Sequence, residues 1–186
     1  MVDSGAELAT RSLPLSGVHG GAAAVRLAAA EPAGRISLRV RKEDVPALSA
    51  ALGVDLPMKP KTSAFANGRT ALWLGPDEWL VIDEGNSGLT TAAANSGVLH
   101  SATDVSHRNT AILVEGPGAA ATINVGCPQD LSLKAFPVGA CSRTIFGKVE
   151  IVLLRTGEDA FRVEVWRSFS DYAFGLLSEG ARDAAL

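Results

Sequence analysis

The chain has 186 residues and a mass of 19.2 kDa, a size that fits one domain or two small, closely packed ones. Its 47% apolar and 20% charged residues are typical of globular proteins and exclude a wholly disordered chain. The formal charge of −3 lacks the basic excess of nucleic-acid-binding proteins. No run of about 18 apolar residues occurs, and the first 20 residues lack the pattern of a secretory signal. We therefore expect no nucleic-acid partner and no membrane association.

The cysteines and histidines predict no metal or redox site. Cys127 and Cys141 are too far apart for a CxxC redox pair and too few for a disulfide framework. Two reduced, buried thiols are expected, which is typical of a cytoplasmic protein. His19, His100 and His107 are scattered, and none has the i, i+4 partner that a helical metal site needs.

The first part of the chain predicts an extended arm followed by alternating strands and helices. Residues 1–22 show no periodicity and are expected to form the arm. Residues 35–40 alternate apolar and polar side chains, as in a half-buried strand. Asp44 then predicts a helix N-cap and Gly53 the helix end. Further elements are predicted as strands at 70–74 and 79–83, a helix at 89–96 and a strand at 98–103.

The same order starts again in the second part of the chain. A strand at 110–115 is followed by a helix ending at Val125, and three strands are predicted at 140–146, 149–155 and 161–166. A closing helix at 170–180 is expected to turn one stripe to the core: Phe169, Tyr172, Ala173, Leu176 and Leu177. We therefore predict an α+β fold of two intimately packed strand–helix–hairpin–helix (ferredoxin-like) halves. They span residues 23–105 and 106–186 and form one compact unit.

Two of these strands are apolar on both faces. If the sheet were covered on one side only, apolar and polar side chains should alternate along its strands. Residues 110–115 and 149–155 show no such alternation. The second face is therefore expected to be covered, either by the other half of the chain, which we favour, or by a partner protein.

Several polar clusters contain catalytic residue types without catalytic spacing. Asp104, Ser106 and His107 are the ingredients of a nucleophilic triad, but neighbours in an extended segment point apart. We expect a loop in which Asp104 and Ser106 bind backbone amides. Asp77 and Glu78 are expected to be solvated acids of a hairpin turn, since acid–base pairs need opposed carboxylates.

Two further motifs also have a structural interpretation. The Gly116-Pro117-Gly118 turn lacks the residues of a phosphate loop and predicts a strand-to-helix connection. Arg162 and Glu164 alternate with apolar residues and predict a solvated outer face with a charge pair.

Three aromatic residues are candidates for a partner interface. Trp73 and Trp79 flank the hairpin turn, and their strands also carry Leu, Val and Ile, so a core position is favoured for both. Phe174 lies off the predicted stripe of the last helix and is a candidate for its partner-facing side. No catalytic, cofactor-binding or metal-binding residue is predicted.

Three segments together form a specific pattern: Trp73-Leu-Gly-Pro-Asp-Glu-Trp-Leu-Val81, Asp104-Val-Ser-His-Arg108 with the following Gly116-Pro-Gly118, and Asn124-Val-Gly-Cys-Pro-Gln-Asp-Leu131. In them the chain resembles the gamma subunit of heterotetrameric sarcosine oxidase, and the resemblance covers about residues 35–180. That subunit is in turn similar to the folate-binding core of the glycine-cleavage T-protein, which implies the same duplicated fold.

The resemblance implies a non-catalytic structural subunit in a complex with alpha, beta and delta subunits. Such a complex oxidatively demethylates sarcosine to glycine with O2, giving H2O2 and 5,10-methylenetetrahydrofolate. It implies FAD, FMN, NAD, tetrahydrofolate and zinc in the other subunits and no cofactor in this chain.

Two alternatives stay open. One is the equivalent subunit of an oxidase for another N-methyl amino acid. The other is a stand-alone folate-binding or aminomethyltransferase-like protein, with Asp104 or Glu115 facing the pterin. The chain lacks the T-protein's C-terminal module and the Lys-Gly-Cys-x-x-Gly-Gln-Glu signature of the other folate-fold branch, so no folate-contacting residue is carried over.

Overall fold

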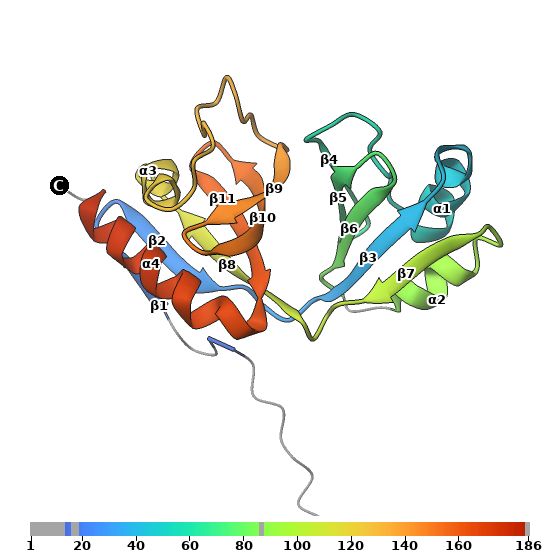
Figure 1. The fold of residues 1–186 in the computed structure, drawn as a ribbon, viewed down its shortest axis with the longest axis horizontal. Coiled ribbons are helices and arrows are strands. Elements are labelled where there is room, and N and C mark those ends of the chain that lie inside the picture. Colours follow the sequence, from blue (N-terminus) through green and yellow to red (C-terminus); the bar gives the residue numbers. More distant parts are fainter. Residues whose placement is uncertain (1–13, 16–18, 86–87, 185–186) are drawn as a thin grey trace, which may run out of the picture.

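Two antiparallel sheets that face each other organise the computed structural model, which describes residues 14–15, 19–85 and 88–184 (Figure 1). In spatial order, the five-stranded sheet contains β4 (Ser63–Ala66), β5 (Arg69–Gly75), β6 (Glu78–Asp83), β3 (Gly34–Val40) and β7 (His100–Asp104). The six-stranded sheet contains β1 (His19–Ala22), β2 (Val25–Ala29), β8 (Asn109–Glu115), β11 (Ala160–Trp166), β10 (Val149–Gly157) and β9 (Cys141–Phe146).

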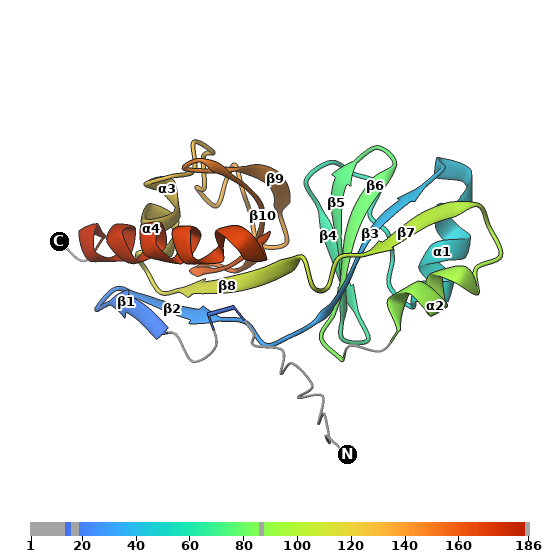
Figure 2. The same cartoon turned by 60° about the horizontal axis from the view of Figure 1, so that its bottom comes forward.

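Helices cover the outer face of each sheet, so that the layers run helix, sheet, sheet, helix (Figures 1 and 2). The helices are α1 (Val45–Leu52), α2 (Leu89–Ala94), α3 (Ala119–Asn124) and α4 (Ser170–Asp183), with 3-10 turns η1 (Lys42–Asp44) and η2 (Arg167–Phe169). Helices α1 and α2 pack on the five-stranded sheet, and α3 and α4 pack on the six-stranded sheet. None of the helices in the described part of the chain is long and apolar enough to cross a bilayer.

The N-terminal hairpin β1–β2 joins the sheet of the second half, while β3 to β7 form the other sheet. Strands β2 and β3 are consecutive, yet β2 pairs with β8 of the six-stranded sheet and β3 belongs to the other sheet. In the same way, β7 pairs with β3, and the next strand, β8, lies in the other sheet. The linkers 30–33 and 105–108 therefore cross where the halves meet (Figure 1). The Val105 amide donates to the Arg35 carbonyl at 2.9 Å at this crossing.

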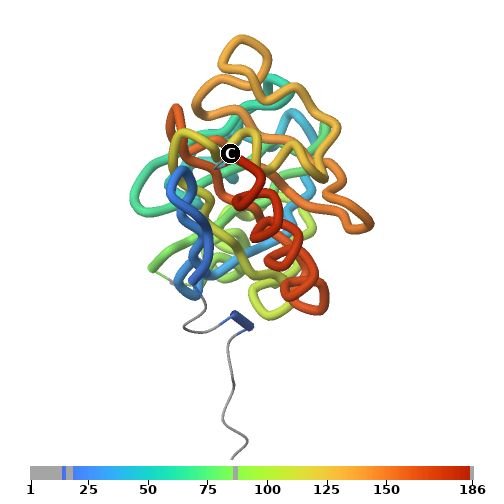
Figure 3. The backbone as a smooth tube through the Cα atoms, turned by 90° about the vertical axis from the view of Figure 1, so that its left-hand side faces the viewer, coloured from blue at the N-terminus to red at the C-terminus, as the bar shows by residue number. Residues whose placement is uncertain are grey.

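This topology changes the expected division of the chain. Residues 19–29 belong to the sheet of the second half, although the sequence placed 23–29 in the first. The last residues of the expected arm form β1, which lies beside α4 (Figure 3). Residues 1–13 and 16–18 of that arm lie outside the described residues. The strands β1 and β2 escaped prediction because Gly, Ala and short length hide their alternation.

Helix α1 shows how the sequence determines an element. Val45, Leu48 and Leu52 recur at helical spacing, and all three are buried. Gly53 ends the helix with a φ of 62°, as predicted, because glycine adopts the left-handed conformation without a Cβ clash. Asp44 occupies the N-cap position without a side-chain cap bond, and its carboxylate instead accepts from Arg41 at 2.8 Å.

The closing helix faces the core with a different stripe from the one predicted. Ala173 and Leu177 are fully buried as expected, but Phe169 and Tyr172 are 40% and 42% exposed. Phe174 is buried instead, against the β1 strand at Gly20. The physical reason is that β1 and β2 extend the sheet beneath α4, so the helix is covered on a flank that the prediction left open.

Strand β10, one of the two doubly apolar strands, has its second face covered within the chain. Val152 and Leu154 of β10 form an inter-sheet cluster with Leu72, Leu80 and Ile82 of the other sheet. The opposite face of β10, with Ile151 and Leu153 among its side chains, packs under the helices. The favoured intramolecular explanation is therefore confirmed for this strand.

Candidate functional site: a charged seam between the sheets

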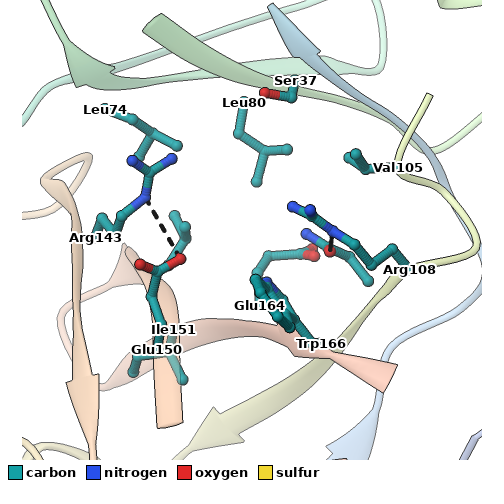
Figure 4. Close-up of a pocket in the computed structure, with 12 residues that line it drawn as sticks. Ser37, Leu74, Leu80, Val105, Arg108, Arg143, Glu150, Ile151, Glu164 and Trp166 are labelled. Atoms are coloured by element: carbon teal, nitrogen blue, oxygen red, sulfur yellow. Dashed lines mark hydrogen bonds and ion pairs between the residues drawn. The ribbon is translucent and has the colours of Figure 1, made fainter. Parts of the chain in front are cut away.

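Charged side chains gather where the two sheets face each other. We call this set the seam, and it consists of Arg35 and Arg39 on β3, Glu78 on β6, Arg143 on β9, and Arg162 and Glu164 on β11. Figure 4 shows part of it, where Arg143, Glu150 and Glu164 face Ser37, Leu74 and Leu80 of the other sheet.

At the centre of the seam, one carboxylate is shared by two guanidinium groups. Arg35 donates from Nε and Nη2 to Glu164 at 2.7 and 3.1 Å, and Arg162 donates from Nε to the same carboxylate at 2.8 Å. All three residues are at least nine-tenths buried, with exposures of 3%, 7% and 2% for Arg35, Arg162 and Glu164. Removing such charges from water is costly unless they are paired, so this cluster depends on every member.

This arrangement corrects the prediction of a solvated face at Arg162 and Glu164. Alternation of apolar and charged residues normally marks a sheet with one wet face. Here the polar face of β11 meets the polar face of β3, and the pair Arg35–Glu164 joins residues that are 129 positions apart.

Nearer the edge of the seam, Glu78 is held by two arginines. It accepts from Arg39 at 2.9 Å and from Arg143 through both guanidinium Nη atoms. The hydrogen bond from Arg143 lowers the pKa of the Glu78 carboxyl below its ordinary value of 4.5, although partial burial opposes that shift. Glu78 is therefore a buried ion-pair member rather than the solvated turn acid that was predicted, while Asp77 stays exposed beside Arg39.

The hollow drawn in Figure 4 is too small for a substrate. Its cavity volume is about 30 Å³, the room of a single water molecule. Arg108 lies at its edge with its guanidinium 4.8 Å from the Trp166 ring centroid. The Trp166 ring in turn stacks on Phe169 with centroids 6.1 Å apart. These ring contacts place exposed aromatic surface next to the seam.

The predicted loop and turn motifs fold as structural elements. Asp104 accepts the Ser106 amide at 2.8 Å, and the Ser106 hydroxyl accepts the Arg35 amide at 2.8 Å, which confirms the loop interpretation. Gly116 has a φ of 124°, and a Cβ there would lie 2.4 Å from the Ala24 carbonyl oxygen. The glycine-rich turn therefore fits closely against the β1–β2 hairpin, as a strand-to-helix connection does.

The thiols and the candidate interface residues are mostly buried. Cys127 and Cys141 are free and buried, as predicted, and burial raises the pKa of the Cys141 thiol to about 12. Trp79 is fully buried, with its indole donating to the Pro57 carbonyl at 2.8 Å. Phe174 is 8% exposed, so neither Trp79 nor Phe174 presents a partner-facing surface. Trp73 packs partly buried against the same core as Trp79.

Sequence reasoning missed a run of exposed aromatic residues near the C-terminal helix. Trp166, Phe169 and Tyr172 are 39%, 40% and 42% exposed and follow one another through the end of β11 and the start of α4. The available signal was the position of Trp166 at the end of a strand, on the opposite face from Val163 and Val165.

Comparison with known proteins gives one consistent family. Residues 43–183 match the model described as "Sarcosine oxidase, gamma subunit family". The sarcosine oxidase subunit gamma of Arthrobacter sp. is 37% identical over 142 residues, which cover 75% of this chain and 70% of that protein. The subunit of the same name from Corynebacterium sp. strain U-96 is 34% identical over 134 residues, covering 70% of this chain and 65% of that protein.

Solved structures give the same fold. A chain of the heterotetrameric sarcosine oxidase from Corynebacterium sp. U-96, in complex with pyrrole 2-carboxylate, superposes with a TM-score of 0.83 at 28% identity. The match covers 93% of this chain and 91% of that chain. The aminomethyltransferase T of the glycine cleavage system from Bartonella henselae gives a TM-score of 0.64 at 19% identity over 87% of this chain. This chain spans 49% of that protein, and the likeness concerns the fold alone.

Proposed function

The chain belongs to the sarcosine oxidase gamma subunit family, and from this premise we propose that it is a non-catalytic structural subunit of a heterotetrameric sarcosine oxidase. The observation that carries the proposal is the likeness to a chain of such a tetramer along 93% of the sequence, with a TM-score of 0.83. The partners are the alpha, beta and delta subunits. The cytoplasmic location inferred from the cysteines stays a prediction.

In this proposal the complex converts sarcosine, O2 and tetrahydrofolate into glycine, H2O2 and 5,10-methylenetetrahydrofolate. FAD, FMN, NAD, tetrahydrofolate and zinc belong to the other subunits. The geometry of the seam supports a structural role for this chain. Glu78 and Glu164 are each engaged by two arginines, so these carboxylates serve ion pairs and are poorly suited to move protons. The substrate could equally be another N-methyl amino acid, since the substrate site is assigned to a different chain.

We also propose that the exposed aromatic residues face a partner subunit. Trp166 and Phe169 form a stacked pair beside Arg108, and aromatic and arginine side chains are enriched at the centre of protein interfaces. This surface replaces Trp79 and Phe174, which the chain buries itself.

Co-expression with the other subunits tests the proposal. A tagged alpha subunit should retain this chain through purification, and the complex should produce H2O2 from sarcosine. The double variant Trp166→Ser/Phe169→Ser should lose retention, while the control Phe65→Ser, which changes a side chain that is 71% exposed on β4, should keep it. A complete active complex that assembles without this chain would overturn the proposal.

The folate-binding alternative receives less support. Asp104 and Glu115 were the expected pterin-facing carboxylates, but Asp104 holds the Ser106 amide and Glu115 pairs with Arg26. Calorimetric titration of the chain with tetrahydrofolate separates the two functions, because a structural subunit should give no binding heat.

We infer that each half is a ferredoxin-like unit divided near residues 105–106. The spatial order β5-β6-β3-β7, with α1 and α2 on one face, supports this description for the first half.

A further inference from the structure

Two loops from different halves of the chain meet in a groove on the surface. The loop between α1 and β4 contributes Lys59, Pro60 and Lys61, and the loop between α3 and β9 contributes Pro137 and Val138. We call this hollow, which has a volume of about 390 Å³, the lysine groove. Figure 1 shows both loops at the upper edge of the molecule, whereas α4 starts at the lower edge. The groove is therefore separate from the exposed aromatic residues near the start of α4.

The positive charge of the groove is not compensated within the described part of the chain. Three of the five lysines, Lys59, Lys61 and Lys134, occur in these two loops, and all three are exposed. No carboxylate of the described residues forms an ion pair with any of them, and no acidic residue lines the groove. The arginines of the seam differ, because each of them is paired with a glutamate. The lysines are thus available to the carboxylates of another molecule.

Exposed apolar side chains accompany these lysines. Met58 precedes Lys59 and is 42% exposed, while Leu133 and Val138 of the other loop are 47% and 51% exposed. A molecule that bound here would therefore bury apolar surface in addition to forming ion pairs. This combination favours a protein segment over a simple polyanion, which would use the lysines and leave the apolar side chains in water.

The two loops are fixed to each other, although the lysines and apolar residues lie outside helices and strands. Ser63 donates from its amide and its hydroxyl to the Gly139 carbonyl at 3.0 and 2.7 Å. The Cys141 amide donates to the Lys61 carbonyl at 3.1 Å, and the fully buried Phe136 anchors the second loop in the core. The groove is therefore formed before a partner arrives, which lowers the entropic cost of binding.

The backbone of Lys61 supports a use for its side chain. Its φ is 60°, in the left-handed region that residues with a Cβ atom disfavour and glycine adopts readily. The Thr62 hydroxyl donates to the Lys59 carbonyl at 2.7 Å and closes the turn that carries both lysines. Strained positions of this kind are concentrated at ligand-binding and partner-binding sites.

We propose that the lysine groove binds an acidic segment of another subunit, with apolar side chains among its carboxylates. The carboxylates pair with Lys59, Lys61 and Lys134, and the apolar side chains lie on Met58 and Val138. Opposite charges of this kind orient two chains and accelerate their association. This inference rests on the proposed function, because it takes the partner from the same complex.

Zero-length cross-linking of the co-expressed complex tests the inference. A water-soluble carbodiimide joins a lysine amine to a carboxylate only where the two are in contact. The complex, purified through its tagged alpha subunit, should give cross-linked peptides that join Lys59 or Lys61 to an aspartate or glutamate of another subunit. Lys42, which is exposed in η1 at the start of α1, is the control and should give no cross-link to another subunit.

The outcomes separate this inference from the proposed function. If the complex contains this chain but Lys59 and Lys61 give no cross-link to another subunit, the inference is overturned and the proposed function stands. If a complete active complex assembles without this chain, both are overturned.

Charge variants measure the contribution of the groove. The double variant Lys59→Glu/Lys61→Glu should leave the immobilised complex at a lower NaCl concentration than the parent chain, because attraction is replaced by repulsion. Lys59→Arg/Lys61→Arg keeps the charge and should leave at the concentration of the parent. Lys42→Glu is the matched control for a reversed surface charge. Release of Lys59→Glu/Lys61→Glu at the same NaCl concentration as Lys42→Glu would contradict the site.

Discussion

Residues 161–165 of strand β11 are buried on both faces, but the two faces are held by different forces. Phe161 and Val163 point to the helices and are 1% exposed, while Glu164, on the opposite face, is 2% exposed. The helix side is stabilised by removal of apolar surface from water, which needs no particular partner. The seam side is stabilised by pairing, so Glu164 is tolerated only while Arg35 stays in place. Burial alone therefore does not tell how a face of this sheet will respond to substitution or to pH.

The largest effect is expected on the helix-facing side of the five-stranded sheet, where Trp79 of β6 is buried. Trp79→Ala should lower the free energy of unfolding by about 3–5 kcal/mol, because a fully buried indole leaves a cavity that the core cannot close. The hydrogen bond from the indole to Pro57 is lost as well. Urea unfolding measures this loss, which should be the same between about pH 5 and pH 8, where the ion pairs keep their charges.

Trp73→Ala is the control for this prediction. Trp73 is only partly buried against the same core, so a smaller loss is expected. An unchanged urea midpoint for Trp79→Ala would show that the core between the five-stranded sheet and its helices does not depend on this ring.

The next effect tests the dependence of the seam on pairing. Glu164→Gln leaves Arg35 and Arg162 buried without their carboxylate and should cost about 3 kcal/mol. The triple variant Arg35→Met/Glu164→Leu/Arg162→Leu should recover most of that loss, because apolar residues of similar size need no partners. Chemical denaturation of the parent, single and triple variants measures both steps. If Glu164→Gln were as stable as the parent, the distinction between the two faces of β11 would be lost.

The smallest effect is a pH dependence at the seam's edge. The pKa of Glu78 is lowered in the folded chain, so its carboxylate contributes stability above the ordinary value of 4.5, and this contribution is lost as the pH falls through the lower folded value. The size should be about 0.2–1 kcal/mol, because the Arg143 side chain is 36% exposed and solvent screens the pair.

Unfolding of Glu78→Gln at a series of pH values checks this sign. The variant should be less stable than the parent at neutral pH, and the two should converge in acid. Glu115→Gln is the control, since Glu115 forms a surface pair with Arg26 that is much more exposed. A Glu78→Gln variant that keeps the full acid dependence of the parent would assign that dependence to other carboxylates.

The elements with strong local signals were predictable from the sequence. Strand β3 follows its apolar alternation, and α1 ends at Gly53 as expected. Strand β4, with the sequence Ser-Ala-Phe-Ala, was missed because four small or isolated apolar residues carry no clear period. The hairpin β1–β2 was missed for the same reason, and with it the burial of Phe174.

The seam could not be predicted, because its pairs join distant parts of the chain. Arg35 and Glu164 each occupy the polar side of an alternating strand, and local sequence does not tell whether that side meets water or another sheet. The available hint was the doubly apolar 149–155 stretch, which already required a covered second face. That hint was correct for Val152 and Leu154, and extending it to their strand neighbours on β11 would have placed Glu164 inside.

The crossing of the linkers 30–33 and 105–108 has a consequence for how the chain can be divided. A fragment ending before β7 would carry β2 without β8 and β3 without β7, and the complementary fragment would have the reciprocal gaps. Each fragment alone would expose unpaired strand edges, and these edges would be paired again only when the two fragments bind each other. In the intact protein both parts belong to one chain, so this strand pairing is intramolecular. It is favoured by a high effective concentration and does not depend on the concentration of the protein.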